Sequence, residues 1–385
     1  MIISFAWLIC GLVAVPLVLL VAECLAGLRR QSSSARPGNP PPITVLMPAH
    51  DEEAGIARAV QAVQAQLRPR DRIFVIADNC TDDTATIAAG LGATVIERCD
   101  PGRCGKGYAL EAGRAAVEAR PGEIVIIVDA DCHSGPDALL RLADTAARRH
   151  AVVQGAYLLL PREGANPLVQ LSCFAFLVKN LVRQIGLQRL SGLALLQGSG
   201  MAFPWSLLRE ADFCPASIVE DVHMGLKLVL AGETVAFDPD ARFFSEASST
   251  SGTKDQRRRW EHGLLATAGS FVPRLVRSAV TERPSLLMIA LDLIIPPTVP
   301  LVAAAVLALI LAFALEGTTA PVLMLATLLA LLALALLLAW NRHARGLLPR
   351  PGLVSGISYF FWKLPVAVQF VTNRQRQWTR TEREP

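Results

Sequence analysis

The sequence is poor in charged side chains and lacks the cysteine spacing of a metal site. Charged residues make up 18% of the 385 residues, whereas 52% are hydrophobic, and the mean hydropathy is +0.40. This composition excludes an ordinary soluble enzyme, although a chain lying wholly in lipid would be more apolar still. The eight cysteines include no C-x-x-C pair, which argues against a zinc site and against a dense disulfide scaffold. We therefore expect free thiols in a reducing cytosol.

Nucleic-acid-binding patterns and the pattern of a cleaved signal peptide are also missing. The net charge is +4, but no helix-turn-helix, zinc-finger or RNP pattern accompanies it. Much of the arginine lies beside apolar segments, so membrane lipid is favoured over nucleic acid as its partner. The basic residues Arg29 and Arg30 follow the N-terminal apolar run, 2–28, rather than precede it, unlike those of a signal peptide. Because the run exceeds the roughly 20 residues that a span requires, we expect residues 1–30 to be a transmembrane anchor whose N-terminus lies outside.

The middle of the sequence alternates short apolar runs with helical stretches. A polar, proline-rich linker over 31–42 precedes this region. The alternation predicts βαβ units over 43–270, with a mostly parallel, Rossmann-like α/β sheet and ligands at the carboxyl ends of its strands. The expected strands cover 43–47, 72–77, 94–96 and 123–128, and the expected helices cover about 54–67, 82–90 and 106–119.

Long apolar segments return in the last third of the chain. Residues 286–345 predict a transmembrane hairpin with spans over about 294–315 and 322–340. The apolar stretch within 346–385 carries Lys363 near its middle, and a lysine at the bilayer centre costs about 3 kcal/mol or more. We therefore expect an interfacial helix here, followed by a basic cytosolic tail. The segment 165–196 mixes apolar and charged residues, and either a helix in the membrane interface or an amphipathic core helix fits it.

Carboxylates follow the expected strands at the points where these strands end. Asp78 follows the second strand, and Asp129 and Asp131 follow the fourth. Parallel strands bring such residues to one edge of the sheet, where like charges repel unless a cation or polar ligand offsets them. A divalent metal ion shared with a diphosphate would do so, because hard cations take oxygen ligands. The alternative role, turn former or helix cap, is preferred for Asp82 and Asp83, which open the next helix.

Seven short motifs, in this order, resemble those of the family 2 glycosyltransferases. They are Pro48-Ala49-His50-Asp51-Glu52-Glu53, Asp78-Asn79-Cys80-Thr81-Asp82-Asp83-Thr84, Gly105-Lys106-Gly107-Tyr108-Ala109-Leu110, Asp129-Ala130-Asp131, Gly198-Ser199-Gly200-Met201-Ala202-Phe203, Glu220-Asp221 and Gln256-Arg257-Arg258-Arg259-Trp260. The last is a Q-x-x-R-W element similar to that of the branch with cellulose, chitin and hyaluronan synthases, ceramide glucosyltransferase and exopolysaccharide glycosyltransferases. A single D-x-D or E-D motif is weakly specific, whereas the ordered set is specific. The resemblance covers 43 to about 265 and implies a GT-A fold.

The resemblance also implies roles for individual residues. The nucleotide-sugar site would hold the base on Asp78 and comprise, besides it, His50, Glu52, Lys106, Asp129, Asp131 and Arg259. The D-x-D carboxylates of Asp129 and Asp131 would bind Mg²⁺ or Mn²⁺. Lys106 and Arg259, with the metal, would offset the charge of the departing diphosphate. Asp221 would be the general base that deprotonates the acceptor, and Gln256 and Trp260 would bind that acceptor.

Resemblance and membrane segments together predict an inverting hexosyltransferase. We expect it to move a sugar from a nucleotide diphosphate sugar, most simply a UDP-sugar, to a membrane-bound, lipid-linked acceptor in exopolysaccharide or glycolipid biosynthesis. Its catalytic domain would face the cytosol at the inner (plasma) membrane, with membrane lipids and other polysaccharide-assembly proteins as partners and no nucleic acid.

Three alternatives to this function differ in how well the sequence supports them. A processive polysaccharide synthase stays open, since Q-x-x-R-W elements occur in both kinds of enzyme, although polymer-extruding members carry more spans. A transporter is disfavoured because two or three spans cannot line a pore alone. An inactive scaffold protein is disfavoured because all the motif carboxylates are present.

Overall fold

The computed structural model describes residues 5–29, 38–214, 217–348 and 352–372, except for the side chains of 353, 354, 364 and 366–372. The described chain divides into two compact units. The sheet unit comprises 38–162 and 193–248, and the helical unit comprises 5–29, 163–192 and 249–372. The segment expected to be one domain, 43–270, thus contributes to both units. Most of the expected linker and the basic tail lie outside the described residues.

An eight-stranded mixed sheet forms the centre of the sheet unit, with the strand order β3-β2-β1-β4-β7-β6-β8-β5. Its first half is parallel: β1 pairs with β2 and β4, and β2 pairs with β3. In the second half β6 and β8 are parallel, whereas β7 and β5 run antiparallel to their neighbours. The strands are β1 (Ile43–Ala49), β2 (Arg72–Asp78), β3 (Thr94–Arg98), β4 (Ile124–Ile127), β5 (Cys132–Ser134), β6 (Val152–Leu160), β7 (Met201–Pro204) and β8 (Val235–Glu246).

Crossover helices connect the parallel strands and agree with the predicted βαβ units. The helices of this unit are α2 (Ile56–Gln64), α3 (Thr84–Gly90), α4 (Lys106–Val117), α5 (Ala138–Arg149), α8 (Trp205–Leu208) and α9 (Glu220–Leu230). Every residue of β1 and β4 is buried, as expected of parallel strands that are covered on both faces. Helix α5 contacts β4, β6, β7 and β8, so it packs across the join between the two halves of the sheet. Because β1 is parallel to both β2 and β4, the carboxyl ends of these three strands lie at the same edge of the sheet.

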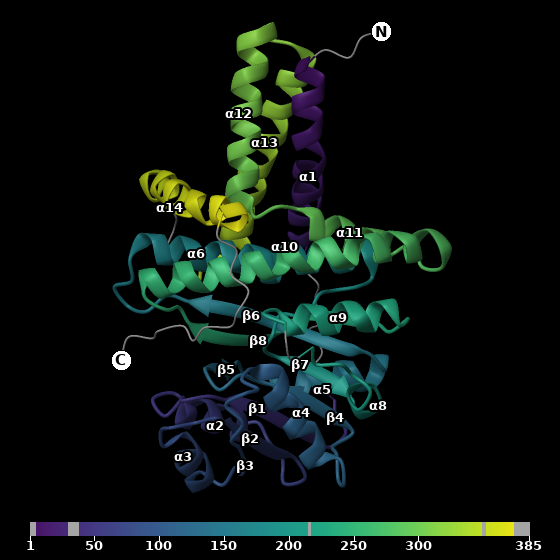
Figure 1. Ribbon diagram of the computed structural model, residues 1–385, viewed down its shortest axis with the longest axis vertical. Coiled ribbons are helices and arrows are strands. Elements are labelled where there is room, and N and C mark those ends of the chain that lie inside the picture. The colour runs from purple at the N-terminus through teal and green to yellow at the C-terminus, as the bar shows by residue number, and fades with distance from the viewer. Residues whose placement is uncertain (1–4, 30–37, 215–216, 349–351, 373–385) are drawn as a thin grey trace. The chain divides into compact units, whose positions relative to one another are not determined.

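Three long apolar helices run side by side in the helical unit (Figure 1): α1 (Phe5–Gly27), α12 (Thr298–Glu316) and α13 (Ala320–Ala339). Three of the four buried residues of α12 are small, Ala305, Ala308 and Ala312, the fourth being Leu301, while Ile310 and Phe313 are exposed. This arrangement is typical of membrane helices, which approach closely through small residues and turn large apolar side chains toward lipid. The two spans expected in this region correspond to two helices joined at Gly317-Thr318-Thr319, and their crossing of a membrane stays a prediction.

Four helices of the described chain are long and apolar enough to cross a membrane. They are Phe5–Gly27, Pro167–Ser191, Thr298–Glu316 and Ala320–Ala344, the last including the π-helical turn η2 (Trp340–Ala344). Three of them coincide with the expected spans. The fourth is the segment that also fits an interfacial or core helix, and here it forms one continuous stretch of α6 (Pro167–Leu177), η1 (Val178–Val182) and α7 (Arg183–Ser191).

A buried ionic triad joins three helices of this unit. Arg183 on α7 donates from Nε to Oε2 of Glu23 on α1 at 2.7 Å, and from Nη2 to Oδ1 of Asp292 on α11 (Leu286–Ile294) at 2.6 Å. All three side chains are buried or nearly so. The only charge within the N-terminal apolar run and a charge of the mixed segment 165–196 thus neutralise each other.

Two glycines allow the backbone of α1 to meet those of η1 and α7 beside this triad. A β-carbon on Gly186 would stand 2.1 Å from the carbonyl oxygen of Glu23, and one on Gly27 would stand 2.0 Å from that of Val182. Backbone atoms cannot move aside for a side chain, so glycine is required at both positions.

Lys363 lies on α14 (Leu353–Thr372) and is buried. Its ammonium group forms an ion pair at 2.6 Å with Glu261 of α10 (Thr250–Thr281). On the other side of α14, Ile357 and Phe361 are exposed. The lysine charge that the sequence presents as a cost to spanning the bilayer therefore has a partner within the protein, and the interfacial location of α14 stays a prediction.

Candidate functional site

The candidate site is centred on Lys106, the first residue of α4. Its ammonium group forms an ion pair with the carboxylate of Asp129, which follows β4, and donates a hydrogen bond of 2.8 Å to the carbonyl oxygen of Gly198. Oδ2 of Asp221 lies 3.5 Å from the position where a β-carbon on Gly198 would stand. Three residues predicted for the site from separate motifs, Lys106, Asp129 and Asp221, are therefore neighbours.

Negative charge exceeds positive charge around Lys106. Burial alone lowers the pKa of the Lys106 ammonium group, but the carboxylates of Asp129, Glu220 and Asp221 outweigh it, and the pKa is raised. Burial raises the pKa of the Asp129 carboxyl, and nearby Asp131 adds to this, although Lys106 opposes it. Burial, followed by repulsion from Asp221, raises the pKa of Glu220 to about 7. Burial is the first cause of the raised pKa values of Asp129 and Glu220, whereas neighbouring carboxylates add to both and alone raise that of Lys106. An excess of carboxylates of this kind favours the binding of further cations.

The loop before β7 connects these groups. The backbone N–H of Asp129 donates to Oγ of Ser199 at 3.1 Å, and the next residue, Gly200, donates its N–H to the carbonyl oxygen of Ile127 on β4. Gly200 has a φ of +70°, and a β-carbon on it would stand 2.3 Å from Cδ2 of Phe243. Gly200, the second glycine of the Gly-Ser-Gly motif, is thus required for the backbone conformation and for the close packing against β8.

The chemistry of the donor set fits Mg²⁺ or Mn²⁺. Asp129 and Asp131 offer hard oxygen ligands in a region of excess negative charge. Within the described residues, the only group of three His, Cys, Asp or Glu side chains with mutually close ligand atoms is Asp51, Cys80 and Asp82. The D-x-D pair is therefore not part of an all-protein cage. This suits Mg²⁺, which is usually held by one or two carboxylates together with substrate phosphates.

Asp78 lies at the end of β2 and is paired with Arg98. The two residues are register partners on the parallel strands β2 and β3, and Nη1 of Arg98 donates to Oδ1 of Asp78 at 2.5 Å. The amide of Asn79 donates to the same oxygen at 3.1 Å. The guanidinium group also lies over the ring of Tyr108, 5.4 Å from its centroid. An aromatic ring, a cation and a carboxylate are thus gathered beside the expected base pocket.

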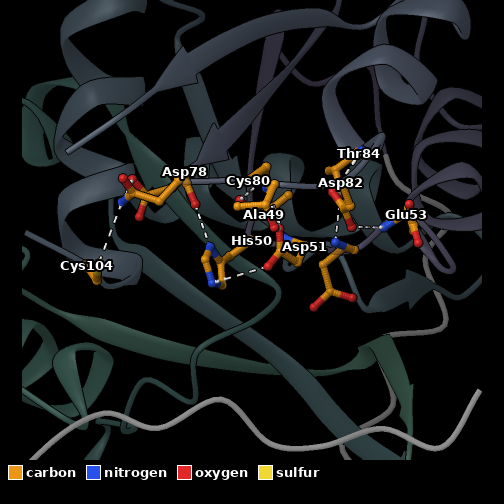
Figure 2. A network of polar contacts seen from close by, with 12 residues as sticks. Ala49, His50, Asp51, Glu53, Asp78, Cys80, Asp82, Thr84 and Cys104 are labelled. Carbon is orange, nitrogen blue, oxygen red and sulfur yellow. Dashed lines mark hydrogen bonds and ion pairs between the residues drawn. The ribbon is translucent and has the colours of Figure 1, made fainter. Parts of the chain in front are cut away.

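His50 lies beside Asp78, as the motifs predict (Figure 2). Its Nδ1 is 2.7 Å from the carbonyl oxygen of Asp78, and its Nε2 is 3.8 Å from Oδ2 of Asp51. Glu52 anchors the same turn through its backbone, since its N–H donates to Oγ1 of Thr84 at 2.7 Å. The structure therefore brings His50, Glu52 and Asp78 to one sheet edge, and their role in binding a nucleotide stays a prediction.

Backbone N–H groups form hydrogen bonds with the carboxylates in the cluster of Asp51, Cys80 and Asp82. The N–H of Thr81 donates to Asp51 at 2.7 Å, and the N–H groups of Glu53 and Thr84 donate to Asp82 at 3.0 Å each. Asp82 thus acts as a turn former at the start of α3, as the sequence indicates. Asp83 precedes the helix without a side-chain capping bond.

The residues of the Q-x-x-R-W element lie on α10, which belongs to the helical unit. Arg257 is buried, and its guanidinium group binds the hydroxyl and carbonyl oxygens of Ser172 on α6 at 3.0 and 3.1 Å. The indole of Trp260 stacks on Phe176 with a centroid separation of 5.4 Å. Arg257, which occupies a variable position of the motif, thus fixes α10 to α6. The donor role of Arg259 and the acceptor roles of Gln256 and Trp260 stay predictions.

Three residues with clear roles in the site's geometry are not among those that the motifs assign. Arg98 lies outside the predicted site because the sequence predicts that the third strand ends at Ile96, two residues before the partner of Asp78. Glu220 belongs to the Glu220-Asp221 motif, which assigns a role to Asp221 alone. Gln154 lies in β6, outside every motif, and no sequence pattern marks it.

Sequence comparison shows the family of the protein, and structure comparison shows its fold. The sequence profile of glycosyltransferase-like family 2 matches residues 40–263. Among solved structures, the mannosyltransferase PcManGT from Pyrobaculum calidifontis, in complex with GDP-Man and Mn²⁺, has a TM-score of 0.61 at 19% identity. That comparison covers 96% of this chain and 100% of the mannosyltransferase. The prediction of a GT-A α/β fold is confirmed.

Two curated relatives match over shorter stretches. The low-salt glycan biosynthesis hexosyltransferase Agl6 of Haloferax volcanii is 41% identical over 95 residues, which are 24% of this chain and 21% of the relative. The probable glycosyltransferase YdaM of Bacillus subtilis is 25% identical over 242 residues, which are 58% of this chain and 55% of the relative. The chain thus spans about a fifth and about half the length of these two proteins. Since the family profile covers more than half of the chain, the protein belongs to glycosyltransferase-like family 2.

Proposed function

We propose that this protein is an inverting hexosyltransferase that moves a sugar from a nucleotide diphosphate sugar to a membrane-held acceptor. One observation carries the proposal: Lys106 binds Asp129 and Gly198, and Asp221 lies beside the same glycine. A cation, a candidate metal ligand and a candidate base at one edge of a nucleotide-binding type of sheet are the groups that sugar transfer needs.

Each of these residues has a distinct task in the proposed reaction. Asp221 accepts the proton of the acceptor hydroxyl as the oxygen attacks the anomeric carbon. The diphosphate departs from the opposite face, so one displacement inverts that carbon. The ammonium group of Lys106 offsets charge on the departing diphosphate. Asp129 and Asp131 would hold a divalent cation, whose positive charge would stabilise the leaving diphosphate.

The geometry at Asp78 favours a uracil base over guanine. Within the described residues, the donors to this carboxylate, Arg98 and Asn79, converge on Oδ1. That leaves Oδ2 to accept one N–H from a base. Uracil presents a single N–H between two carbonyl groups, whereas guanine presents two N–H groups side by side. A UDP-sugar is therefore the proposed donor.

The acceptor is proposed to be a lipid-linked glycan or a glycolipid. Support comes from the apolar helices α1, α12 and α13, each of which exposes several large apolar side chains, and from the matched relative Agl6, a hexosyltransferase of glycan biosynthesis. A role in exopolysaccharide assembly at the inner membrane, with the sheet unit in the cytosol, completes the proposal. Nucleotide sugars are made in the cytosol, so the unit that carries Asp78 and Asp131 has to face it.

The decisive experiment compares Asp221→Asn with the wild-type protein in native membranes supplied with a panel of nucleotide sugars. We expect kcat to fall about 10²- to 10⁴-fold, the usual contribution of a general base, while UDP binding stays within about twofold because the base acts only on the acceptor. Asp212→Asn is the matched control, since Asp212 is an exposed carboxylate paired with Lys227. Near-normal turnover by Asp221→Asn would remove this residue from the catalytic role.

A second variant tests the metal. Asp131→Ala should abolish the Mn²⁺-dependent part of UDP binding in calorimetry, because it removes a hard ligand. Equal affinity with and without Mn²⁺, in both wild type and variant, would show that the D-x-D pair is structural. Sizing the products separates the two acceptor modes: a ladder of long polymers would favour the processive synthase, and a single addition the transferase.

A further inference from the structure

Gln154 is a fully buried polar residue in the middle of the mixed sheet. It lies on β6, outside the motifs, and none of the predicted site roles is assigned to it. Its side-chain amide reaches the 197–200 loop, which we define as Gln197 to Gly200. Both the oxygen and the nitrogen of the amide form hydrogen bonds with this loop. A buried amide stabilises a structure only when its donors and its acceptor are both satisfied.

The orientation of this amide is fixed by its partners. The N–H of Gln197 donates to Oε1 of Gln154 at 2.8 Å, so the oxygen must face that side. Nε2 then donates to the carbonyl oxygens of Ser199 at 2.8 Å and of Gly155 at 2.7 Å. A rotation of the amide by 180° would place donor against donor and acceptor against acceptor, so one arrangement is selected.

The 197–200 loop is the common support of the groups around Lys106. Its Gly198 carbonyl oxygen accepts from the Lys106 ammonium group at 2.8 Å, and its Ser199 hydroxyl accepts from the N–H of Asp129 at 3.1 Å. Gly198 and Gly200 have φ values of +95° and +70°, so the loop has little intrinsic preference for this shape. The Gln154 amide binds Ser199, which itself binds Asp129, and the neighbouring Gly198 binds Lys106.

We propose that Gln154 is a positioning residue that sets the 197–200 loop and thereby aligns Lys106 and Asp129 for transfer. This inference rests on the proposed function. Gln154 does not touch substrate, and it acts through the loop on residues that do. Small displacements matter for such groups, because a misplacement of about 1 Å can cost 10²-fold in rate.

Two variants separate the amide's donor and acceptor roles. Gln154→Leu removes both, whereas Gln154→Glu keeps an oxygen for the Gln197 N–H but, when ionised, cannot donate to Ser199. We expect kcat to fall about 10- to 100-fold in each, with the KM for the donor changed less than threefold. Thr145→Val is the matched control, because the buried hydroxyl of Thr145 also donates a hydrogen bond, of 3.0 Å to Asp238, but lies away from the loop.

Hydrogen exchange of the 197–200 amides, measured on the full chain in detergent, gives a readout that is independent of turnover. Faster exchange in both Gln154 variants, but not in Thr145→Val, together with the loss of kcat, supports the proposal. Faster exchange with unchanged kcat overturns it, because the loop is then held without consequence for the reaction. Unchanged exchange also overturns it. If the wild-type protein transfers no sugar from any donor, the proposed function fails, and the exchange measurement alone still decides whether Gln154 holds the loop.

Discussion

Replacement of Arg183 by methionine should destabilise the helical unit strongly. The variant keeps the apolar stem and removes only the guanidinium group that binds Glu23 and Asp292. Glu23 is 0% and Asp292 is 9% exposed, so both carboxylates would stay away from water without a partner cation. The reasoning concerns the energy of a buried charge that has lost its counter-charge.

The structure sets the size of this effect. Removal of one partner from a buried ion pair typically costs about 3–5 kcal/mol. For cooperative units of 150–250 residues, 1 kcal/mol corresponds to roughly 2–4 °C in Tm, so Arg183→Met should lower Tm by roughly 6–20 °C. The triple replacement Glu23→Met, Arg183→Met and Asp292→Leu removes all the charges, and such exchanges are often neutral. It should therefore recover most of the loss.

Thermal unfolding of protein in lipid nanodiscs, followed by intrinsic fluorescence, measures both variants. Arg148→Met is the control for the substitution itself, because Arg148 is 65% exposed and pairs with Asp144 one helical turn away. Exposed pairs of this kind contribute roughly 0.3–0.5 kcal/mol, so Tm should change little. If Arg183→Met were as mild as Arg148→Met, or the triple variant as damaging as Arg183→Met, the assignment of a desolvated triad would be refuted.

Two further predictions concern the sheet unit. Gly200→Ala should abolish stable folding of this unit, because a β-carbon would stand 2.3 Å from Phe243 in addition to the strain of a positive φ. Gly92→Ala is the control, since φ is also positive there but the space is open, and it should cost only about 1–2 kcal/mol. Equal losses of stability in chemical denaturation of the two variants would contradict the clash. The folded-state pKa of Glu220 is raised from about 4.5 to about 7, so its burial costs wild-type stability progressively as pH rises through that range and no more above it. Glu220→Gln should therefore gain Tm relative to wild type up to about pH 7 and then keep a constant lead, whereas a lead that is the same at every pH would show that Glu220 titrates normally.

Local patterns in the sequence determined the class of fold and the strand ends at which the candidate site lies. Runs of β-branched residues alternating with helical periodicity identify the βαβ half, since each element depends mainly on its own residues and their spacing. The strand ends then place Asp78 and Asp129 at one edge, because the carboxyl ends of parallel strands coincide. The apolar runs likewise locate α1, α12 and α13, since their length alone is diagnostic.

Contacts between residues distant in the sequence were decided only by the tertiary structure. Arg98 pairs with Asp78 because β2 and β3 are in register, and a strand's last two residues are the least certain part of a sequence-based boundary. Gln154 reaches the 197–200 loop, and Lys363 finds Glu261, over separations that no local period encodes. Charges that the sequence presents as a cost to burial, such as Glu23 and Arg183, become partners once their helices pack. Local patterns specify elements, whereas a pair of side chains from two elements has an energy only after folding brings them together.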